Sequence, residues 1–145
     1  MRLLPALLVA GLALAVPVAG CDANPFDPAQ QPVVTVTLAA GAPVVAWSPE
    51  GARLVRVYRG ATAGDGYGPD LVWSVAAEDD ANAVRSPVTV GITPPGAAVD
   101  VPLAGPLVAG ATYTAEITRR DPRGRGDGFT NTANRYVGTA TFTAP

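Results

Sequence analysis

Short runs rich in Val, Thr and aromatic residues, broken at regular intervals by Gly, Pro, Asp and Asn, fill the chain after Pro32. Such runs favour strands, because β-branched and aromatic side chains pack well on a pleated sheet while Gly and Pro mark turns. No segment of useful length shows the 3.6-residue period of an amphipathic helix. We therefore expect eight strands, at residues 33–38, 43–47, 53–59, 70–75, 87–92, 99–103, 112–119 and 135–143.

Apolar residues alternate within several of these runs, which is typical of strands that bury one face. The rows expected to face a core are Val34, Val36 and Leu38; Val55 and Val57; Leu71, Trp73 and Val75; and Val99, Val101 and Leu103. The sequence therefore predicts an all-β fold, a single β-sandwich of seven to eight antiparallel strands. The segment from Asp70 to Ile92 fits this pattern least well and is expected to form an extra or irregular edge.

The beginning of the chain has the three parts of an export signal: a basic residue, an apolar run over residues 3–18, and small residues before a cut. Ala19 and Gly20 are followed by Cys21, the only cysteine of the chain. This pattern resembles the lipobox of bacterial lipoproteins, and the resemblance implies cleavage between Gly20 and Cys21 and attachment of diacylglycerol to Cys21. The alternatives are an ordinary secretory signal or an uncleaved membrane helix, which needs about 20 apolar residues.

We expect three regions: a signal peptide (1–20), a lipidated N-terminus with a Pro-rich unstructured tether (21–32), and the sandwich (33–145). The expected location is the bacterial cell envelope, on the non-cytoplasmic side of a membrane, with the covalent lipid on Cys21 as the membrane contact. Asp22 resembles the signal that keeps enterobacterial lipoproteins on the inner membrane. Other bacterial groups do not follow that rule, so the choice between inner and outer membrane stays open.

Two local patterns resemble the fibronectin type III domain, with an immunoglobulin-like variant as the alternative. Trp47-Ser48-Pro49 and the run at 53–59 are similar to that family's second-strand tryptophan, turn and third strand. Residues 107–113 are similar to its Leu-x-x-Gly-x-x-Tyr corner. The resemblance implies that Trp47 is a central core residue and that the Tyr113 hydroxyl bonds back to nearby backbone. It implies adhesion, spacing or protein contact, and no chemistry.

Composition argues against catalysis. The chain has no His and no Lys, so the commonest general base and the bases that activate serine nucleophiles are missing. Glu78, Asp79 and Asp80 are consecutive and point different ways, unlike a positioned acid pair. Once Arg2 is removed with the leader, nine arginines face twelve acids, a formal charge of −3 that disfavours nucleic acid. We expect no enzyme, no cofactor and no metal site, and a monomer.

One basic cluster stands out on this acidic chain, where five arginines lie within seventeen residues: Arg119, Arg120, Arg123, Arg125 and Arg135. We expect residues 120–134 to form a loop at the end of the sandwich from which the tether leaves, so that Arg120, Arg123 and Arg125 contact a membrane or a partner. A solvated loop is the alternative. Arg125-Gly126-Asp127 matches the integrin-recognition tripeptide, a match that arises easily by chance in such a loop, and no site is assigned to it.

The remaining candidates are weaker. Residues 64–70 and 127–134 carry oxygen ligands but lack the spaced carboxylates of a calcium loop. Trp73 and Tyr58 could form a sugar-stacking face, although aromatics on alternating strands usually belong to a core. The sequence thus predicts a lipid-anchored, non-catalytic binding or spacer module that acts mainly through protein contact. The alternatives are a carbohydrate-binding surface module for an envelope polysaccharide, a freely secreted immunoglobulin-like domain, or an enzyme.

Overall fold

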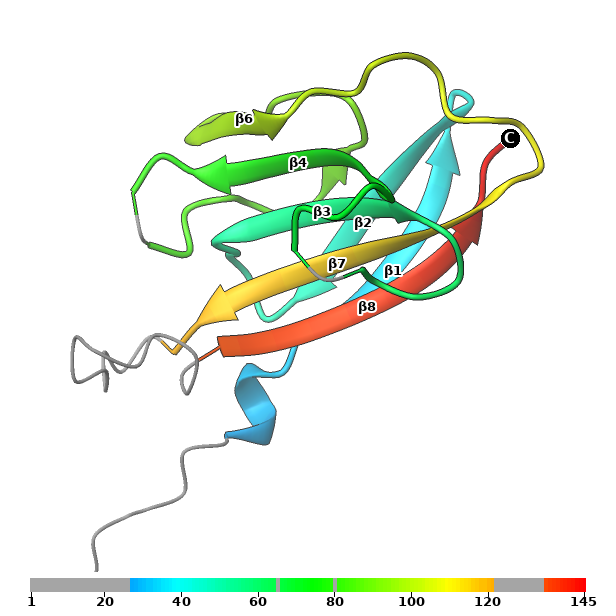
Figure 1. Cartoon of the computed structure of the whole chain (residues 1–145). Coiled ribbons are helices and arrows are strands. Elements are labelled where there is room, and N and C mark those ends of the chain that lie inside the picture. Colours follow the sequence, from blue (N-terminus) through cyan, green and yellow to red (C-terminus); the bar gives the residue numbers. More distant parts are fainter. Residues whose placement is uncertain (1–26, 65, 80, 122–134) are drawn as a thin grey trace, which may run out of the picture.

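The computed structural model describes residues 27–64, 66–79, 81–121 and 135–145, which fold as two packed antiparallel sheets (Figure 1). These residues are all β apart from one short 3-10 turn, so the predicted sandwich is confirmed, and each expected strand overlaps an observed one. The elements are η1 (Pro28–Gln30), β1 (Val33–Ala39), β2 (Ala42–Ser48), β3 (Leu54–Arg59), β4 (Leu71–Ala77), β5 (Val88–Thr89), β6 (Ala97–Val101), β7 (Thr112–Arg120) and β8 (Arg135–Thr143).

The smaller sheet has the order β1-β2-β5 and the larger one the order β6-β4-β3-β7-β8. Every strand pair is antiparallel. The irregular edge expected between Asp70 and Ile92 is β5, which pairs through only two residues with β2. By contrast, β4 in the same segment is an interior strand between β3 and β6.

The core lies between the two sheets and is built from the inward-facing residues of β2, β3, β4 and β7. Its largest members are Trp47 and Trp73, which are 6% and 1% exposed. Val55 and Val57, predicted as a core row, are fully buried, as is Val75. Burial of such side chains stabilises the fold by about 1.5–3 kcal/mol each.

Four residues predicted to face the core do not belong to it, and each has a local cause; Val101 follows a register shift in the β4–β6 pairing, between Ser74 and Val75. A register shift in the β3–β4 pairing, between Val57 and Tyr58, moves Leu71 out of the row and packs Val72 against the core instead. Leu38 is 55% exposed because it lies next to the β1–β2 turn, where the sheet ends. Val99 is 46% exposed because β6 is the outer edge of the larger sheet, which the short β5 leaves uncovered.

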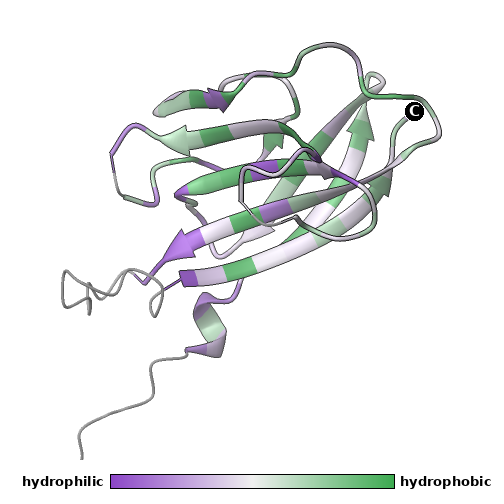
Figure 2. Ribbon diagram, in the orientation of Figure 1, coloured by the Kyte–Doolittle hydropathy of each residue, from purple (hydrophilic) through white to green (hydrophobic). Residues whose placement is uncertain are grey.

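The sandwich has two ends of opposite character. We call the end formed by residues 27–32, 50–52, 82–85, 119–121 and 135–137 the N-terminal pole, because the chain enters the fold there (Figure 1). The distal pole is formed by residues 38–43, 90–92, 102–111 and 144–145. Figure 2 shows hydrophilic residues where β7 ends and β8 begins, and pale to hydrophobic residues along the segment that leads from β6 to β7.

Candidate functional site

The segment Asp27–Pro32 packs on the sandwich and is not a free tether. The Asp27 amide donates to the Tyr136 hydroxyl at 3.0 Å, and the Gln31 side chain donates to the carbonyl of Val137. Pro32 lies so close to Gly138 that a Cβ at that glycine would overlap the Pro32 carbonyl. The predicted boundary between tether and domain therefore moves from Val33 back to Asp27.

A local signal for this segment was present in the sequence. Asp27 caps the short turn η1, since its carboxylate accepts a hydrogen bond from the Ala29 amide at 3.0 Å. Proline at the first position after such a cap has its backbone angle fixed in advance and lacks only an amide that would be unpaired anyway. Asp27-Pro28 thus marks the start of the turn η1, which the high proline content of the segment concealed.

Arg119 joins three separate segments at the N-terminal pole. Its guanidinium donates to the carbonyls of Gly51 at 2.6 Å and Glu50 at 3.0 Å, and to the carbonyl and side-chain oxygens of Gln30, both at 3.2 Å. The residue is only 5% exposed, and burial lowers the pKa of this guanidinium below its ordinary value. Sequence reasoning placed Arg119 in the basic cluster, but the structure gives it an internal, positioning role.

Of the three arginines predicted to contact a membrane or a partner, the structure describes only Arg120. Arg120 is at the end of β7, where its amide and carbonyl form a reciprocal pair of hydrogen bonds with the Asn82 side chain, each 2.8 Å long. Arg123 and Arg125, the tripeptide that includes Asp127, and the possible ligands at 127–134 lie outside the described residues. So do Gly20 and Cys21 and the whole predicted signal peptide.

The two predicted core aromatics are both buried. The Trp47 amide donates to the Ser86 hydroxyl at 2.9 Å, which ties β2 to the segment before β5. The Tyr113 hydroxyl accepts a hydrogen bond from the amide of Val108, five residues upstream, at 2.9 Å. Its ring stacks on Phe142 of β8 with the centroids 5.7 Å apart.

A polar cluster covers the outer face of the larger sheet, beneath the β3–β4 loop. Arg56 lies 3.7 Å from the Glu116 carboxylate and is 5.1 Å from the ring centre of Tyr67. The Tyr67 hydroxyl donates to Asp100 at 2.8 Å. Burial raises the pKa of Glu116 above its ordinary value, while Arg56 and then Arg135 act in the opposite direction.

The remaining candidate residues from the sequence are in the core, in turns or on the surface. Trp73 and Tyr58 are 1% and 0% exposed, so neither can stack on a sugar. Tyr67 belongs to the loop that was considered for calcium, and its side chain is exposed. Asp79 accepts a hydrogen bond from the Ala81 amide at 3.1 Å, as turn residues do. The part of the chain that the structure describes holds no group of three or more potential metal ligands.

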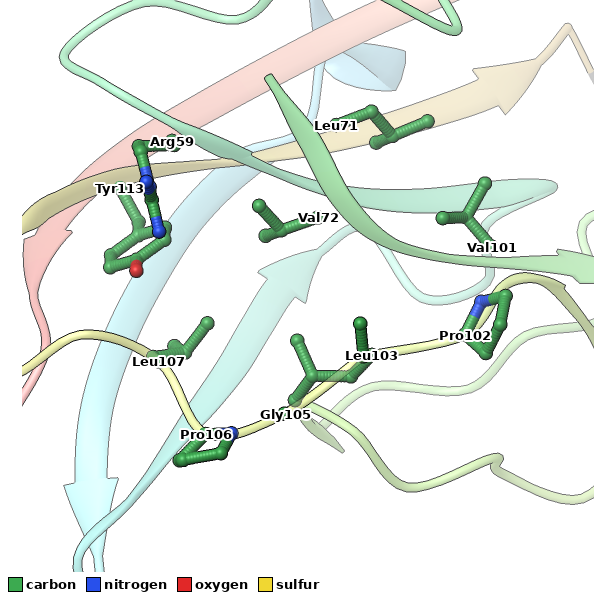
Figure 3. A pocket seen from close by; sticks show the side chains of 11 residues that line it. Arg59, Leu71, Val72, Val101, Pro102, Leu103, Gly105, Pro106, Leu107 and Tyr113 are labelled. Carbon is green, nitrogen blue, oxygen red and sulfur yellow. The ribbon is translucent and has the colours of Figure 1, made fainter. Parts of the chain in front are cut away.

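The distal pole contains a pocket of about 310 Å³ between the starts of β4 and β7 and the segment after β6 (Figure 3). Its wall is aliphatic, and Arg59 lies beside Tyr113 at one end of it. A second pocket of about 250 Å³ adjoins it and shares Leu103, Pro106 and Leu107. Both hollows offer space to a ligand.

No family model, curated protein or solved structure matches the chain. Among the residues that the structure describes, none belongs to a helix long and apolar enough to span a bilayer. The functional argument therefore rests on the residues and their geometry.

Proposed function

We propose that the chain is a lipid-anchored cell-envelope protein whose sandwich binds a protein partner without catalysis. The observation that carries the proposal is Ala19-Gly20-Cys21 directly after an apolar run, only six residues before Asp27, which already packs on the sandwich. A diacylglyceryl group at Cys21 would supply two acyl chains. Because each buried methylene contributes about 0.8 kcal/mol, two chains hold a protein stably on its membrane.

The sandwich itself is proposed to be fibronectin type III-like. Support comes from the hydrogen bond between the Tyr113 hydroxyl and the Val108 amide, which is the geometry of a tyrosine corner. Further support comes from Trp47 on the second strand, buried against the facing sheet. A module of this type serves adhesion, spacing and contact, which agrees with the lack of His and Lys in the chain.

The packing of residues 27–32 gives the proposed anchor a short reach. From Cys21 to Asp27 the chain advances six residues, at most about 22 Å when fully extended. The N-terminal pole would therefore stand next to the bilayer, with Arg120 and Arg135 at the ends of β7 and β8. Basic residues near an anionic surface contribute about 1 kcal/mol each, an effect that fades within about 8 Å at physiological salt.

The anchor is tested by intact mass and detergent partition of the protein from its native cells, beside a Cys21→Ala variant. The proposal predicts a detergent-phase product that lacks residues 1–20 and carries a diacylglyceryl mass, which the variant loses. A water-soluble, unmodified product would refute the anchor and favour a freely secreted domain.

The arginine contact is tested separately, with the unlipidated chain and vesicles that contain anionic lipid. Replacing Arg123 and Arg125 by Ser should weaken binding roughly thirtyfold, which corresponds to about 1 kcal/mol per residue. Arg59→Ser, at the distal pole, serves as the control and should leave binding unchanged. Equal binding by the double variant and the parent chain would rule out this contact.

A further inference from the structure

The distal pole is built from segments that carry no charged side chain. Residues 38–43, 90–92, 102–111 and 144–145 contain no Asp, Glu, Lys or Arg, although the chain has 22 such residues in all. The four segments meet around the 250 Å³ pocket, which is lined by residues from each of them. Leu38, Ile92 and Val108 of these segments are more than half exposed. An apolar, uncharged surface of this kind is typical of interaction sites.

The 310 Å³ pocket at this pole combines an aliphatic wall with one charged residue, Arg59. Leu71, Val72, Val101, Leu103 and Leu107 form its aliphatic wall, as Figure 3 shows. Of the described residues that line it, Arg59 alone is charged. The Arg59 side chain is exposed and forms neither an ion pair nor a side-chain hydrogen bond with the described part of the chain. The pocket thus offers apolar contact and one free cation.

We propose that this pocket binds the carboxyl-terminal residue of a partner polypeptide, with an aliphatic side chain in the pocket and the carboxylate on Arg59. A guanidinium recognises a carboxylate by two parallel hydrogen bonds, which fixes its orientation. The volume fits this occupant: about 150 Å³ holds one benzene ring, so 310 Å³ holds a leucine-sized side chain and the adjoining backbone. The neighbouring pocket has room for a side chain further upstream.

The position of the pocket agrees with the proposed anchor, although the inference rests only on the proposed binding role. The pocket lies at the pole opposite to the chain's entry, so a membrane next to residues 27–32 would leave it open to a partner. The lipid anchor and the peptide site can fail separately. If the protein is acylated but its pocket binds no peptide, only the peptide site is refuted. If the pocket binds peptide but the protein is not acylated, only the anchor is refuted.

The test uses the chain from residue 21 onward with Cys21→Ser, which prevents lipid attachment, titrated in an NMR experiment with acetyl-Ala-Ala-Leu. Binding at millimolar concentration should shift the amide signals of residues 71–72 and 101–107. The same peptide as its carboxamide should bind about tenfold or more weakly, because it lacks the charge that pairs with Arg59. Equal binding of the two peptides, or no shifts in this pocket, would overturn the proposal.

Two variants and one control separate the pocket from the rest of the surface. Arg59→Gln should lower the affinity for the peptide with a free carboxylate to that of the parent protein for the carboxamide. Leu71→Asn, which places a polar side chain in the aliphatic wall at a residue outside the core cluster, should weaken the binding of both peptides. Arg85→Gln, an exposed arginine at the other pole, should change nothing. Octanoate serves as a second ligand, and tighter binding of octanoate than of the peptide would refute the peptide assignment.

Discussion

Single side chains decide how the N-terminal pole is held together, and Arg119 is the clearest case. Its buried guanidinium donates to the buried carbonyl of Gly51 and to the part-buried carbonyls of Glu50 and Gln30, and a buried carbonyl without a partner is costly. A hydrogen bond to a charged donor contributes about 1.5–3 kcal/mol. Arg119 therefore links the N-terminal segment to the sandwich.

We expect Arg119→Ala to lower the free energy of unfolding by about 3 kcal/mol, because it leaves the buried Gly51 carbonyl unpaired and removes the part-buried bonds to Glu50 and Gln30. Arg119→Lys should recover little, since one ammonium cannot reproduce the planar fork that bonds both residues 50–51 and residue 30. The measurement is chemical denaturation, with the exposed Arg85→Ala as the control. A loss as small as that of the control would show that Arg119 does not hold the pole.

Glu116 makes stability depend on pH in the direction opposite to that of most carboxylates. Burial raises its folded-state pKa, so the folded chain holds this proton more tightly than the unfolded chain does. Its contribution to stability should therefore be greatest at acidic pH and fall as pH rises from the ordinary glutamate pKa through the raised one. Glu116→Gln, which stays neutral, should be more stable than the parent protein at pH 7.

Urea denaturation of the two proteins from pH 7 down to pH 4 checks this prediction. The difference between them should shrink as the pH falls, because the parent side chain then also becomes neutral. A parent protein that is more stable than Glu116→Gln at pH 7 would mean that the ion pair with Arg56 outweighs burial.

At the scale of elements, the docking of residues 27–32 depends on the absence of a side chain at Gly138. A Cβ there would overlap the Pro32 carbonyl, and the backbone on both sides leaves little room to move. We expect Gly138→Ala to displace the segment and to speed hydrogen exchange at Gln30 and Gln31, whose amides bond within η1. Gly105→Ala, where a Cβ has open space, is the control. Unchanged exchange would show that the segment tolerates the added methyl group.

Strands were predictable from the sequence because their signal is local. Alternation of Val and Thr with turn residues located each strand, including the core row Val55 and Val57. What escaped prediction depends on contacts between distant residues. The bulge that moves Leu71 outward is set by pairing with β3, and the exposure of Val99 by the limited width of the facing sheet.

The candidate sites also divide into those with a local sequence signal and those formed by residues far apart in the sequence. Lipid attachment at Cys21 is a local pattern and could be proposed from four residues. The pocket next to Arg59 could not, because its wall comes from β3, β4, β7 and the segment after β6, which only the topology brings together. Nor could the internal role of Arg119, since the sequence alone does not distinguish a buried arginine from a solvated one.

At the scale of the whole molecule, only six residues separate the proposed lipid site at Cys21 from Asp27, which packs on the sandwich. Residues 27–32 pack on the N-terminal pole, which would stand close to the proposed lipid, while the largely apolar distal pole would face away from it. The nine residues of β7 separate the two poles by roughly 30 Å. The orientation is therefore large enough to measure.

The most direct measurement is energy transfer from a single fluorophore on the membrane-bound protein to acceptors in the bilayer. Because acylation would occupy the sulfur of Cys21, the only native cysteine, a new one at Arg85→Cys or Ala104→Cys is labelled alone. The account predicts much stronger transfer from position 85, at the N-terminal pole, than from position 104, at the distal pole. Equal transfer from both positions, or stronger transfer from position 104, would contradict it.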